Sequence, residues 1–294
     1  MQVRKATPHQ LGERLWQLIA DVERQHGVPP FGEIQLAAMA EGEPESLGVV
    51  AERNGGTEAY GFAVPTPDRG IWTLELAAGP GIYDWFLERV LEVLEAAGVA
   101  EVVLWVHSPA VEPPLRLVRP ERALYRMSAA ITATDPPVPP DGVTIRGVDV
   151  PRDAPALIRL NNQAFGDHPE QGGWTPRDLE TRLALSWFDP AGLRTAWMGS
   201  RLVAFNWTKV HPEPGPSGET VGEIYSIAVD PSFQGRGLGR TIAVEGLRYL
   251  AANRGAGRAI LYVDSSNTAA LELYRSLGFA TEHVDRAYRW KADR

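Results

Sequence analysis

The stretch "VDPSFQGRGLGRT" at 229–241 decides the fold of the second half of this chain. It follows "GEIYSIAV" at 222–229, a run of β-branched and aromatic residues that predicts a strand. It leads into "LGRTIAVEGLRYLAANRG" at 238–255, whose apolar residues lie near helical spacing. Glycine weakens a strand or helix interior by about 0.5–1 kcal/mol relative to alanine. We therefore expect the glycines between this strand and this helix to serve a purpose that needs a bare backbone.

The segments on either side predict further strands and helices. "TAWMGSRLVAFNWTKVHP" at 195–212 predicts two strands joined by a turn at its Gly-Ser pair. "RAILYVD" at 258–264 predicts another strand. In "NTAALELYRSLGF", Asn267 is a good helix cap and Gly278 a good stop. Strands therefore alternate with helices, and the predicted fold class is a mixed α/β sheet.

The bulk composition is that of an ordinary globular protein. The chain has 294 residues, of which 44% are hydrophobic and 22% charged, and its length exceeds the usual domain size of about 100–150 residues, so two domains are expected. The net charge of −8 argues against general nucleic-acid binding. No apolar run reaches the roughly 18 residues of a membrane helix, and the first residues lack the apolar core of a signal peptide. We expect a cytoplasmic protein that binds neither nucleic acid nor a membrane.

The residue types also exclude several kinds of site. The chain has no cysteine, which excludes disulfides, thiolate catalysis and cysteine-based metal sites. Its six histidines are scattered without His-Glu-x-x-His spacing, so no metal is expected. The sequence does not indicate an oligomeric state, and a monomer is compatible with it.

A proline-rich segment divides the chain. "TATDPPVPPDG" at 132–142 holds four prolines and little to bury, as is typical of a semi-rigid spacer. We predict a first domain at 1–135, a linker at 136–142 and a second domain at 143–294.

The two halves contain short matching segments in the same order. "LAAGP" at 76–80 matches "IAVDP" at 227–231, "LWVHS" at 104–108 matches "LYVDS" at 261–265, and "RALYRM" at 122–127 matches "RAYRW" at 286–290. From the first match to the second, the first half is six residues shorter, which is the length of "QGRGLG". We infer two copies of one fold, of which the first has lost the glycine loop.

The loop at 234–239 has the chemistry of an anion site. Its glycines allow successive N–H groups to turn toward one point at the start of a helix, where unpaired N–H groups and the helix dipole favour anions such as a pyrophosphate. Arg236 and Arg240 can add charged contacts. A Walker loop would end in Gly-Lys-Ser/Thr and a dinucleotide fingerprint would read G-x-G-x-x-G, and neither fits. A plain surface turn stays open at this point.

Two motifs in order resemble the GNAT N-acetyltransferases. They are "IAVDPSFQGRGLG" at 227–239 and a later Asn-x-x-Ala-x-x-x-Tyr-x-x-x-Gly-Phe at 267–279. The resemblance implies acetyl-CoA as co-substrate, a pyrophosphate on the Q-x-x-G-x-G loop, and a pantetheine arm paired with the backbone of 227–229. It also implies that the N–H of Val229 polarises the thioester carbonyl. The implied cofactor contacts are Ile227, Ala228, Val229, Gln234, Gly235, Arg236, Gly237, Leu238, Gly239, Arg240 and Asn267.

A closer resemblance covers nearly the whole chain. Tandem halves, "GVPPFGE" at 27–33, "FGDHPEQGGWT" at 165–175, "WFDPAGL" at 187–193 and "WTKVHP" at 207–212 are similar to the mycothiol synthase family. That family acetylates the cysteinyl amine of cysteinyl-glucosaminyl-inositol. Motifs and spacing alone reach only an acetyl-CoA-dependent amine acetyltransferase. An enzyme for another small amine (an aminoglycoside, a polyamine or an amino-acid conjugate) and a non-catalytic acetyl-CoA sensor stay open.

Two residues are predicted to carry the chemistry. Glu223, at the start of the strand before the glycine loop, can take a proton from the substrate ammonium directly or through water. Tyr274 occupies the position where the family places a tyrosine near the coenzyme sulfur, and it would act as general acid. An ordinary strand-edge glutamate and a core tyrosine are the alternatives.

The residues for the amine substrate rest on the closer resemblance and on residue type. A polyol amine needs hydrogen bonds, an aromatic face and a carboxylate near its cation. The predicted substrate contacts are Glu33, His168, Glu170, Trp174, Lys209 and Tyr262, with His211 at the end of the same predicted strand as Lys209. Each could instead be a loop or core residue.

The first half departs from the family pattern. It has no Q-x-x-G-x-G loop before the predicted helix "GIYDWFLERVLEVLEAAG" at 81–98, and "HSPAVEPPL" at 107–115 replaces the asparagine-led helix. We predict a degenerate domain that is structural and shapes the substrate site, and one active site per chain.

Overall fold

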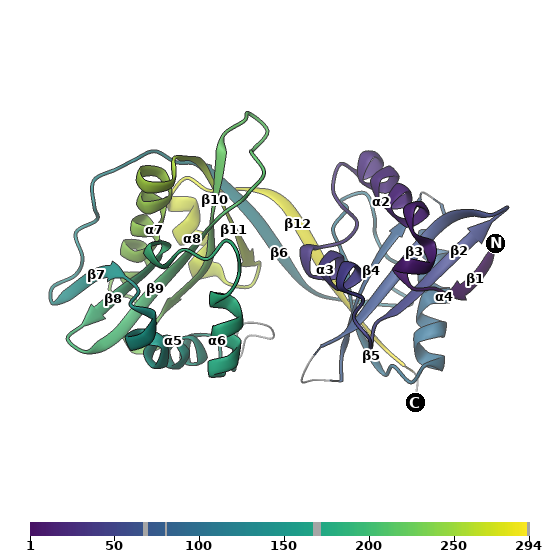
Figure 1. The fold of residues 1–294 in the computed structure, drawn as a ribbon, viewed down its shortest axis with the longest axis horizontal. Helices are drawn as coiled ribbons and strands as arrows, with labels where there is room; N and C mark the ends of the chain where they lie inside the picture. The colour runs from purple at the N-terminus through teal and green to yellow at the C-terminus, as the bar shows by residue number, and fades with distance from the viewer. Residues whose placement is uncertain (67–69, 80, 167–171, 293–294) are drawn as a thin grey trace. The chain divides into compact units, whose positions relative to one another are not determined.

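The computed structural model describes residues 1–66, 70–79, 81–166 and 172–292, and it divides the chain into two compact units (Figure 1). Unit 1 consists of Met1–Tyr125, Asp264–Ser266 and Val284–Arg294, and unit 2 consists of Arg126–Val263 and Asn267–His283. Neither unit is continuous in sequence, because the end of the chain belongs to unit 1. The assignment of structural and catalytic roles to 1–135 and 143–294 stays a prediction.

Unit 1 is a mixed sheet with helices on both faces. Its elements are β1 (Gln2–Lys5), α1 (Pro8–Leu11), α2 (Glu13–His26), α3 (Glu33–Glu41), β2 (Leu47–Arg53), β3 (Gly56–Pro65), β4 (Trp72–Ala78), α4 (Tyr83–Ala96) and β5 (Glu101–Val106). The strand order is β1-β2-β3-β4-β5-β12. The second half of β12 (Ala280–Lys291) pairs antiparallel with β5, with Arg286 opposite Val106. The strand nearest the end of the chain thus completes the unit with which the chain begins.

Two apolar clusters fill unit 1, one on each face of its sheet. Phe86, Val90 and Leu94 of α4 are fully buried against one face. Leu15 and Val22 of α2 are buried against the other. Both helices present apolar residues at helical spacing, which is why each packs along one side.

Unit 2 has the same kind of sheet. Its elements are β6 (Arg119–Ala130, of which Arg126 onward lies in unit 2), β7 (Val143–Gly147), α5 (Val150–Ala164), α6 (Pro176–Leu183), η1 (Pro190–Gly192), β8 (Leu193–Met198), β9 (Arg201–Val210), β10 (Thr220–Val229), η2 (Pro231–Phe233), α7 (Leu238–Arg254), β11 (Ala256–Asp264), α8 (Thr268–Ser276) and the start of β12. The strand order is β6-β11-β10-β9-β8-β7. The predicted mixed α/β fold is confirmed.

The helices of unit 2 lie on opposite faces of its sheet (Figure 1). Leu238 and Ile242 of α7 are buried in a cluster on one face. Leu157 of α5 and Leu179 of α6 are buried with Trp207 on the other. We name these faces the α7 face and the α5–α6 face.

Both units repeat one order of elements around a parallel strand pair. In unit 1 the order is β4, α4 and β5, and in unit 2 it is β10, α7 and β11. The strand β4 includes 76–78 of the first matching segment, and β10 includes 227–229 of its match. After β11 the chain forms α8, whereas residues 107–118, all of them described, form no helix. The predicted loss of this helix from the first half is therefore confirmed.

Among the residues that the structure describes, none of the helices combines the length and the apolar content needed to cross a membrane.

Candidate functional site

The strand β10 contains a β-bulge. Its pairing with β9 places Glu223 opposite Lys209, and the register shifts by one residue between Ile224 and Ser226. A bulge leaves two residues of one strand opposite a single residue of its neighbour and bends the strand that carries it. The strand therefore changes direction in the middle of the predicted site.

The bulge also changes which side chains share a face. A Cβ on Gly222 would lie 2.8 Å from Leu250 of α7, so Glu223, the next residue, faces the α5–α6 side. Beyond the bulge, Ile227 and Val229 pack with the cluster on the α7 face. In a regular strand these odd-numbered residues would all share one face. Because of the bulge, β10 presents Glu223 to one face and Val229 to the other.

The parallel strands β10 and β11 separate where the bulge begins. Their pairing ends with Ile224 opposite Leu261, although β10 continues to Val229 and β11 to Asp264. On its other side β10 remains paired with β9 as far as Val229. The last part of β10 thus has one backbone edge free of β11, and an extended ligand can add hydrogen bonds to such an edge.

The N–H of Val229 points toward this edge. The N–H of Asp230 donates to the carbonyl of Val203 at 2.9 Å. Asp230 and Val203 therefore form a hydrogen-bonded pair. Because hydrogen-bonded and non-hydrogen-bonded pairs alternate along an antiparallel ladder, the preceding pair, Val229 opposite Ala204, is a non-hydrogen-bonded one. The N–H of Val229 therefore points away from β9, as a donor to a ligand would have to.

The glycine loop has the predicted backbone form. Gly235 has φ 73° and Gly237 has φ 80°, values that glycine adopts without strain. Gly237 is the N-cap of α7, and no side chain caps the first N–H groups of that helix. Residues 234–237 are exposed. The start of α7 therefore offers several backbone donors at the surface, which is the arrangement that binds a phosphate.

The turn before the loop is held by an ion pair. Arg201 donates to Asp230 at 2.5 Å, and Asp230 caps η2 by accepting from the N–H of Ser232 at 3.0 Å. Burial by itself raises the pKa of Asp230, but the hydrogen bonds from Ser232 and Arg201 outweigh it and lower the pKa. The guanidinium groups of Arg201 and Arg236 lie 5.0 Å and 5.2 Å from the centre of the Phe233 ring. These contacts thus anchor residues 230–233, directly before the loop.

Three elements meet at the first turn of α7. A Cβ on Gly239 would lie 3.7 Å from Val229 at the end of β10 and 3.8 Å from Leu273 of α8. Arg240 donates to Ser276 of α8 at 2.7 Å. These distances are ordinary contacts, so packing does not require glycine at 239. The sequence motifs at the end of β10, in the loop and on α8 are therefore neighbours in space.

Tyr274 lies on α8, which Asn267 caps by accepting from the N–H of Ala270 at 3.1 Å. Only 5% of the tyrosine is exposed, and its ring lies 5.9 Å from that of Phe279. Burial raises the pKa of the hydroxyl, so the phenol keeps its proton at neutral pH. That hydroxyl makes no hydrogen bond within the described part of the chain. Tyr274 therefore keeps a hydroxyl proton that it donates to no described residue.

Glu223 is buried and has two basic neighbours. Its exposed fraction is 6%, and β10 lies inside the sheet, so an ordinary strand-edge glutamate is excluded. His211 Nε2 lies 2.7 Å from Glu223 Oε2, and Lys209 Nζ lies 3.8 Å from the same oxygen. A buried carboxylate is stable only with such partners. The side chain is thus held by two basic residues that are themselves largely buried.

An aromatic group lies beside this carboxylate on the α5–α6 face. The ammonium of Lys209 lies 5.5 Å from the ring of Trp187, which contacts Tyr225 at 4.8 Å. Trp207 lies 5.9 Å from Tyr225 and 6.2 Å from Trp174. Sequence reasoning missed the contact of Trp187 with Lys209 and with Tyr225. No strand or helix periodicity could have signalled it, because Trp187 lies between α6 and η1.

The other predicted substrate residues have different surroundings. Trp174 is 7% exposed in the aromatic core, and its indole N–H is buried without a partner among the described residues. Tyr262 is 46% exposed and follows the last β11 residue paired with β10. Glu33 begins α3 in unit 1. His168 and Glu170 lie outside the described residues. The substrate roles of all five stay predictions.

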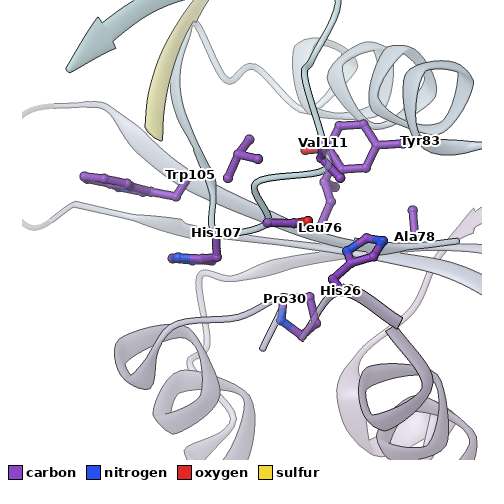
Figure 2. A pocket seen from close by; sticks show the side chains of 10 residues that line it. His26, Pro30, Leu76, Ala78, Tyr83, Trp105, His107 and Val111 are labelled. Atoms are coloured by element: carbon purple, nitrogen blue, oxygen red, sulfur yellow. The ribbon is translucent and has the colours of Figure 1, made fainter. Parts of the chain in front are cut away.

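Unit 1 repeats the strand separation without the exposed loop. The parallel pairing of β4 and β5 ends with Leu74 opposite Leu104. A cavity of about 20 Å³ lies beyond that point, lined by residues that include Leu76, Tyr83 and His107 (Figure 2). This volume is close to the space that one water needs.

A buried ionic cluster adjoins this cavity. His107 Nδ1 lies 2.6 Å from Asp285 Oδ1, and His107 Nε2 lies 3.4 Å from Glu75 Oε1. Glu75 also accepts from the N–H of Gly32 at 2.6 Å, at the start of α3. Burial alone lowers the pKa of His107, but Asp285 and Glu75 outweigh it and raise the pKa to about 10. The raised pKa favours the cationic form of this partly buried imidazole at neutral pH, and its contacts join three segments of unit 1.

Comparison with known protein families and sequences gives a consistent result. The model of the acetyltransferase (GNAT) family matches residues 156–279. A mycothiol acetyltransferase of Nocardia farcinica is 40% identical over 288 residues, covering 92% of this chain and 91% of the relative. A mycothiol acetyltransferase of Thermomonospora curvata is 40% identical over 276 residues, covering 90% of this chain and 89% of the relative.

Solved structures share the fold of the whole chain. A GCN5-related N-acetyltransferase of Sphaerobacter thermophilus has a TM-score of 0.71 at 21% identity, covering 99% of this chain and 95% of the other. A tandem GNAT protein from the clavulanic acid pathway has a TM-score of 0.68 at 13% identity, covering 100% of this chain and 99% of the other. At these identities the likeness concerns the fold alone, and it includes both units.

Proposed function

Because the chain belongs to the mycothiol acetyltransferase family, we propose that it transfers the acetyl group of acetyl-CoA to the cysteinyl amine of cysteinyl-glucosaminyl-inositol and so forms mycothiol. The observation that carries the proposal is β10, which has a buried carboxylate on one face and, at its end, the Val229 N–H on the edge that faces away from β9. Amide formation from an ammonium and a thioester needs both. The reaction would take place in the cytoplasm, where acetyl-CoA is available.

The residues present fit acetyl-CoA. The exposed loop at 234–237 and the uncapped start of α7 supply backbone donors for the pyrophosphate. Arg236 is exposed and can reach a phosphate. The edge of β10 beyond Ile224 can pair with the amides of the pantetheine arm. When bound, acetyl-CoA supplies the activated acetyl group.

Three groups of unit 2 would then carry out the transfer. Glu223 accepts a proton from the substrate ammonium and leaves a neutral amine. The N–H of Val229 donates to the thioester carbonyl and stabilises the negative charge that develops there. Tyr274 gives its proton to the departing thiolate. The hydroxyl of Tyr274, which makes no hydrogen bond within the described part of the chain, supports this last role.

The substrate would bind on the α5–α6 face, beside Glu223. Lys209 and the ring of Trp187 can contact a hydroxyl-rich ligand there. The proposed contacts of Glu33, His168, Glu170, Trp174 and Tyr262 belong to this same proposal. Unit 1 is proposed to be structural and to shape the substrate site, and a calorimetric count of acetyl-CoA sites tests this. One site per chain supports it, and two sites would assign coenzyme binding to unit 1 as well.

The test is an assay of thiol release from acetyl-CoA. Cysteinyl-glucosaminyl-inositol is offered beside an aminoglycoside, a polyamine and cysteine amide at matched concentrations. We expect kcat/KM for the cysteinyl pseudodisaccharide to exceed that for each other amine by at least about 100-fold. A site built to bind its hydroxyls rejects the polyamine and cysteine amide, which lack them, and the hydroxyls of the aminoglycoside are placed differently around its amines.

Three outcomes separate the possible functions. Preference for the pseudodisaccharide supports the proposal. Turnover of another amine alone keeps the acetyltransferase activity and removes the proposed substrate. Acetyl-CoA binding without turnover of any amine would contradict the proposed catalytic activity and favour a non-catalytic acetyl-CoA sensor.

A further inference from the structure

The two oxygens of the Glu223 carboxylate have different surroundings. Oε2 has His211 at 2.7 Å and Lys209 at 3.8 Å. Oε1 makes no hydrogen bond within the described part of the chain. The side chain as a whole keeps 7% of its surface exposed. One oxygen is thus occupied and the other is open.

His211 is held in place by its backbone. Its N–H donates to the carbonyl of Val221 at 2.9 Å, which extends the pairing of β9 and β10 by one residue past Val210. Side chains two residues apart on a strand share a face, so His211 and Lys209 both lie on the face of Glu223. The imidazole reaches Glu223 diagonally across the two strands.

The direction of the hydrogen bond follows from the acceptor. An ionised carboxylate only accepts hydrogen bonds, so Nε2 of His211 carries the proton and donates it to Oε2. Such a bond to a charged group is shorter and stronger than one between neutral groups. It fixes the rotation of the carboxylate, and it leaves the lone pairs of Oε1 for a substrate proton.

We propose that His211 is a positioning residue that holds Glu223 Oε2, so that Oε1 is the oxygen that accepts the proton of the substrate amine. This inference rests on the proposed function, in which Glu223 is the base. The proton passes from the ammonium nitrogen to Oε1, and the amine gains the lone pair that attacks the thioester. His211 keeps its own Nε2 proton throughout.

The first test is kinetic and uses the full chain with the best amine of the panel above. We expect His211→Phe to lower kcat by about 10- to 100-fold, the usual effect of losing one hydrogen bond to a charged group. KM for acetyl-CoA should stay within about twofold. His211→Gln, whose amide can donate from a similar position, should keep most of kcat, whereas His211→Asn is too short to reach Oε2 and should resemble His211→Phe. His9→Phe, at an exposed position in unit 1, is the matched control.

The outcomes of this test are distinct from those for the proposed function. An active wild type with an equally active His211→Phe would overturn the inference and leave the function standing. A His211→Gln as impaired as His211→Phe would also overturn it, because the donated hydrogen bond would not be what matters. Should His211→Phe fail to fold, the comparison of His211→Gln with His211→Asn makes the same distinction.

A second test needs no turnover. Nitrogen NMR of histidine-labelled protein reports which ring nitrogen bears the proton, and the spectrum of His211→Gln assigns the His211 signals. We expect a proton on Nε2 that Glu223→Gln perturbs. A neutral ring protonated only at Nδ1 would refute the proposal even if no amine were a substrate.

Discussion

His107 and Asp285 lie 178 positions apart in the sequence, and their side chains meet at 2.6 Å inside unit 1. The contact joins the residue after β5 to the middle of β12. It is part of the cluster in which Glu75 binds the start of α3. The end of the chain is therefore tied to unit 1 by charge as well as by strand pairing.

This cluster predicts a loss of stability in alkali. The pKa of His107 is raised to about 10 in the folded state, against about 6.5 in an unfolded chain. Its contribution to the free energy of unfolding is complete below pH 6.5 and is lost as the pH rises to about 10. We expect the thermal midpoint of the wild type to fall between pH 7 and pH 10 by at least about 2–4 °C more than that of His107→Gln. Equal slopes for the two proteins would contradict a charged His107.

Substitution of Gly237 is expected to weaken the binding of acetyl-CoA. Gly237→Asp places a side chain and a negative charge where the pyrophosphate would lie, at a residue with φ 80°. We expect the affinity for acetyl-CoA to fall by at least about 100-fold in a calorimetric titration, since charge repulsion adds to the lost contacts. Gly199→Asp, at an exposed hairpin glycine with φ 57°, carries the same kind of backbone strain away from the loop. Equal affinities in the two variants would refute the loop assignment.

Substitution of Glu223 is expected to lower kcat and to leave KM for acetyl-CoA nearly unchanged. Glu223→Gln keeps the size of the side chain and removes its basicity, so kcat should fall by about 100- to 10,000-fold. Because the side chain lies on the α5–α6 face, away from the start of α7 where the pyrophosphate would bind, KM for acetyl-CoA should change little. Glu213→Gln, at an exposed loop position, is the control. Steady-state kinetics at saturating acetyl-CoA decide the matter, and full activity of Glu223→Gln would exclude the proposed base.

Removal of the Tyr274 hydroxyl is expected to lower activity without lowering stability. Its hydroxyl has no described partner, so Tyr274→Phe should unfold within about 1 °C of the wild type. We expect kcat to fall by about 10- to 100-fold, because the departing thiolate loses its proton donor. Tyr249→Phe is the reverse control, since that hydroxyl donates to Asp189. It should lower the thermal midpoint and leave kcat unchanged, and a Tyr274→Phe that behaves in the same way would assign Tyr274 to the core.

The local features of the fold could be read from the sequence because each depends on a few neighbouring residues. The glycine loop adopts positive φ at Gly235 and Gly237 because glycine has no Cβ. The helix α8 begins after Asn267, whose side chain caps it. The hairpin of β8 and β9 turns at Gly199. Motif, cap and turn chemistry act within about one helical turn, so one sequence suffices to predict them.

The location of Glu223 on a strand was also predictable, but its surroundings were not. Its distances to His211 and Lys209 depend on the register between β9 and β10. A bulge of one residue changes which side chains share a face, and nothing in "GEIYSIAV" marks where it falls. The aromatic neighbours Trp187 and Tyr225 come from different parts of the chain and meet only in the folded unit.

The sequence by itself thus determined the elements, the anion-binding loop and the residue types of the site, since these follow from local backbone preferences and side-chain chemistry. The tertiary structure decided three things. It separated β10 from β11 beyond Ile224, it turned the N–H of Val229 away from β9, and it placed Val284–Arg294 in unit 1. Each of these depends on how one strand pairs with another, and the free energy of such a pairing belongs to both partners, so neither segment alone can specify it.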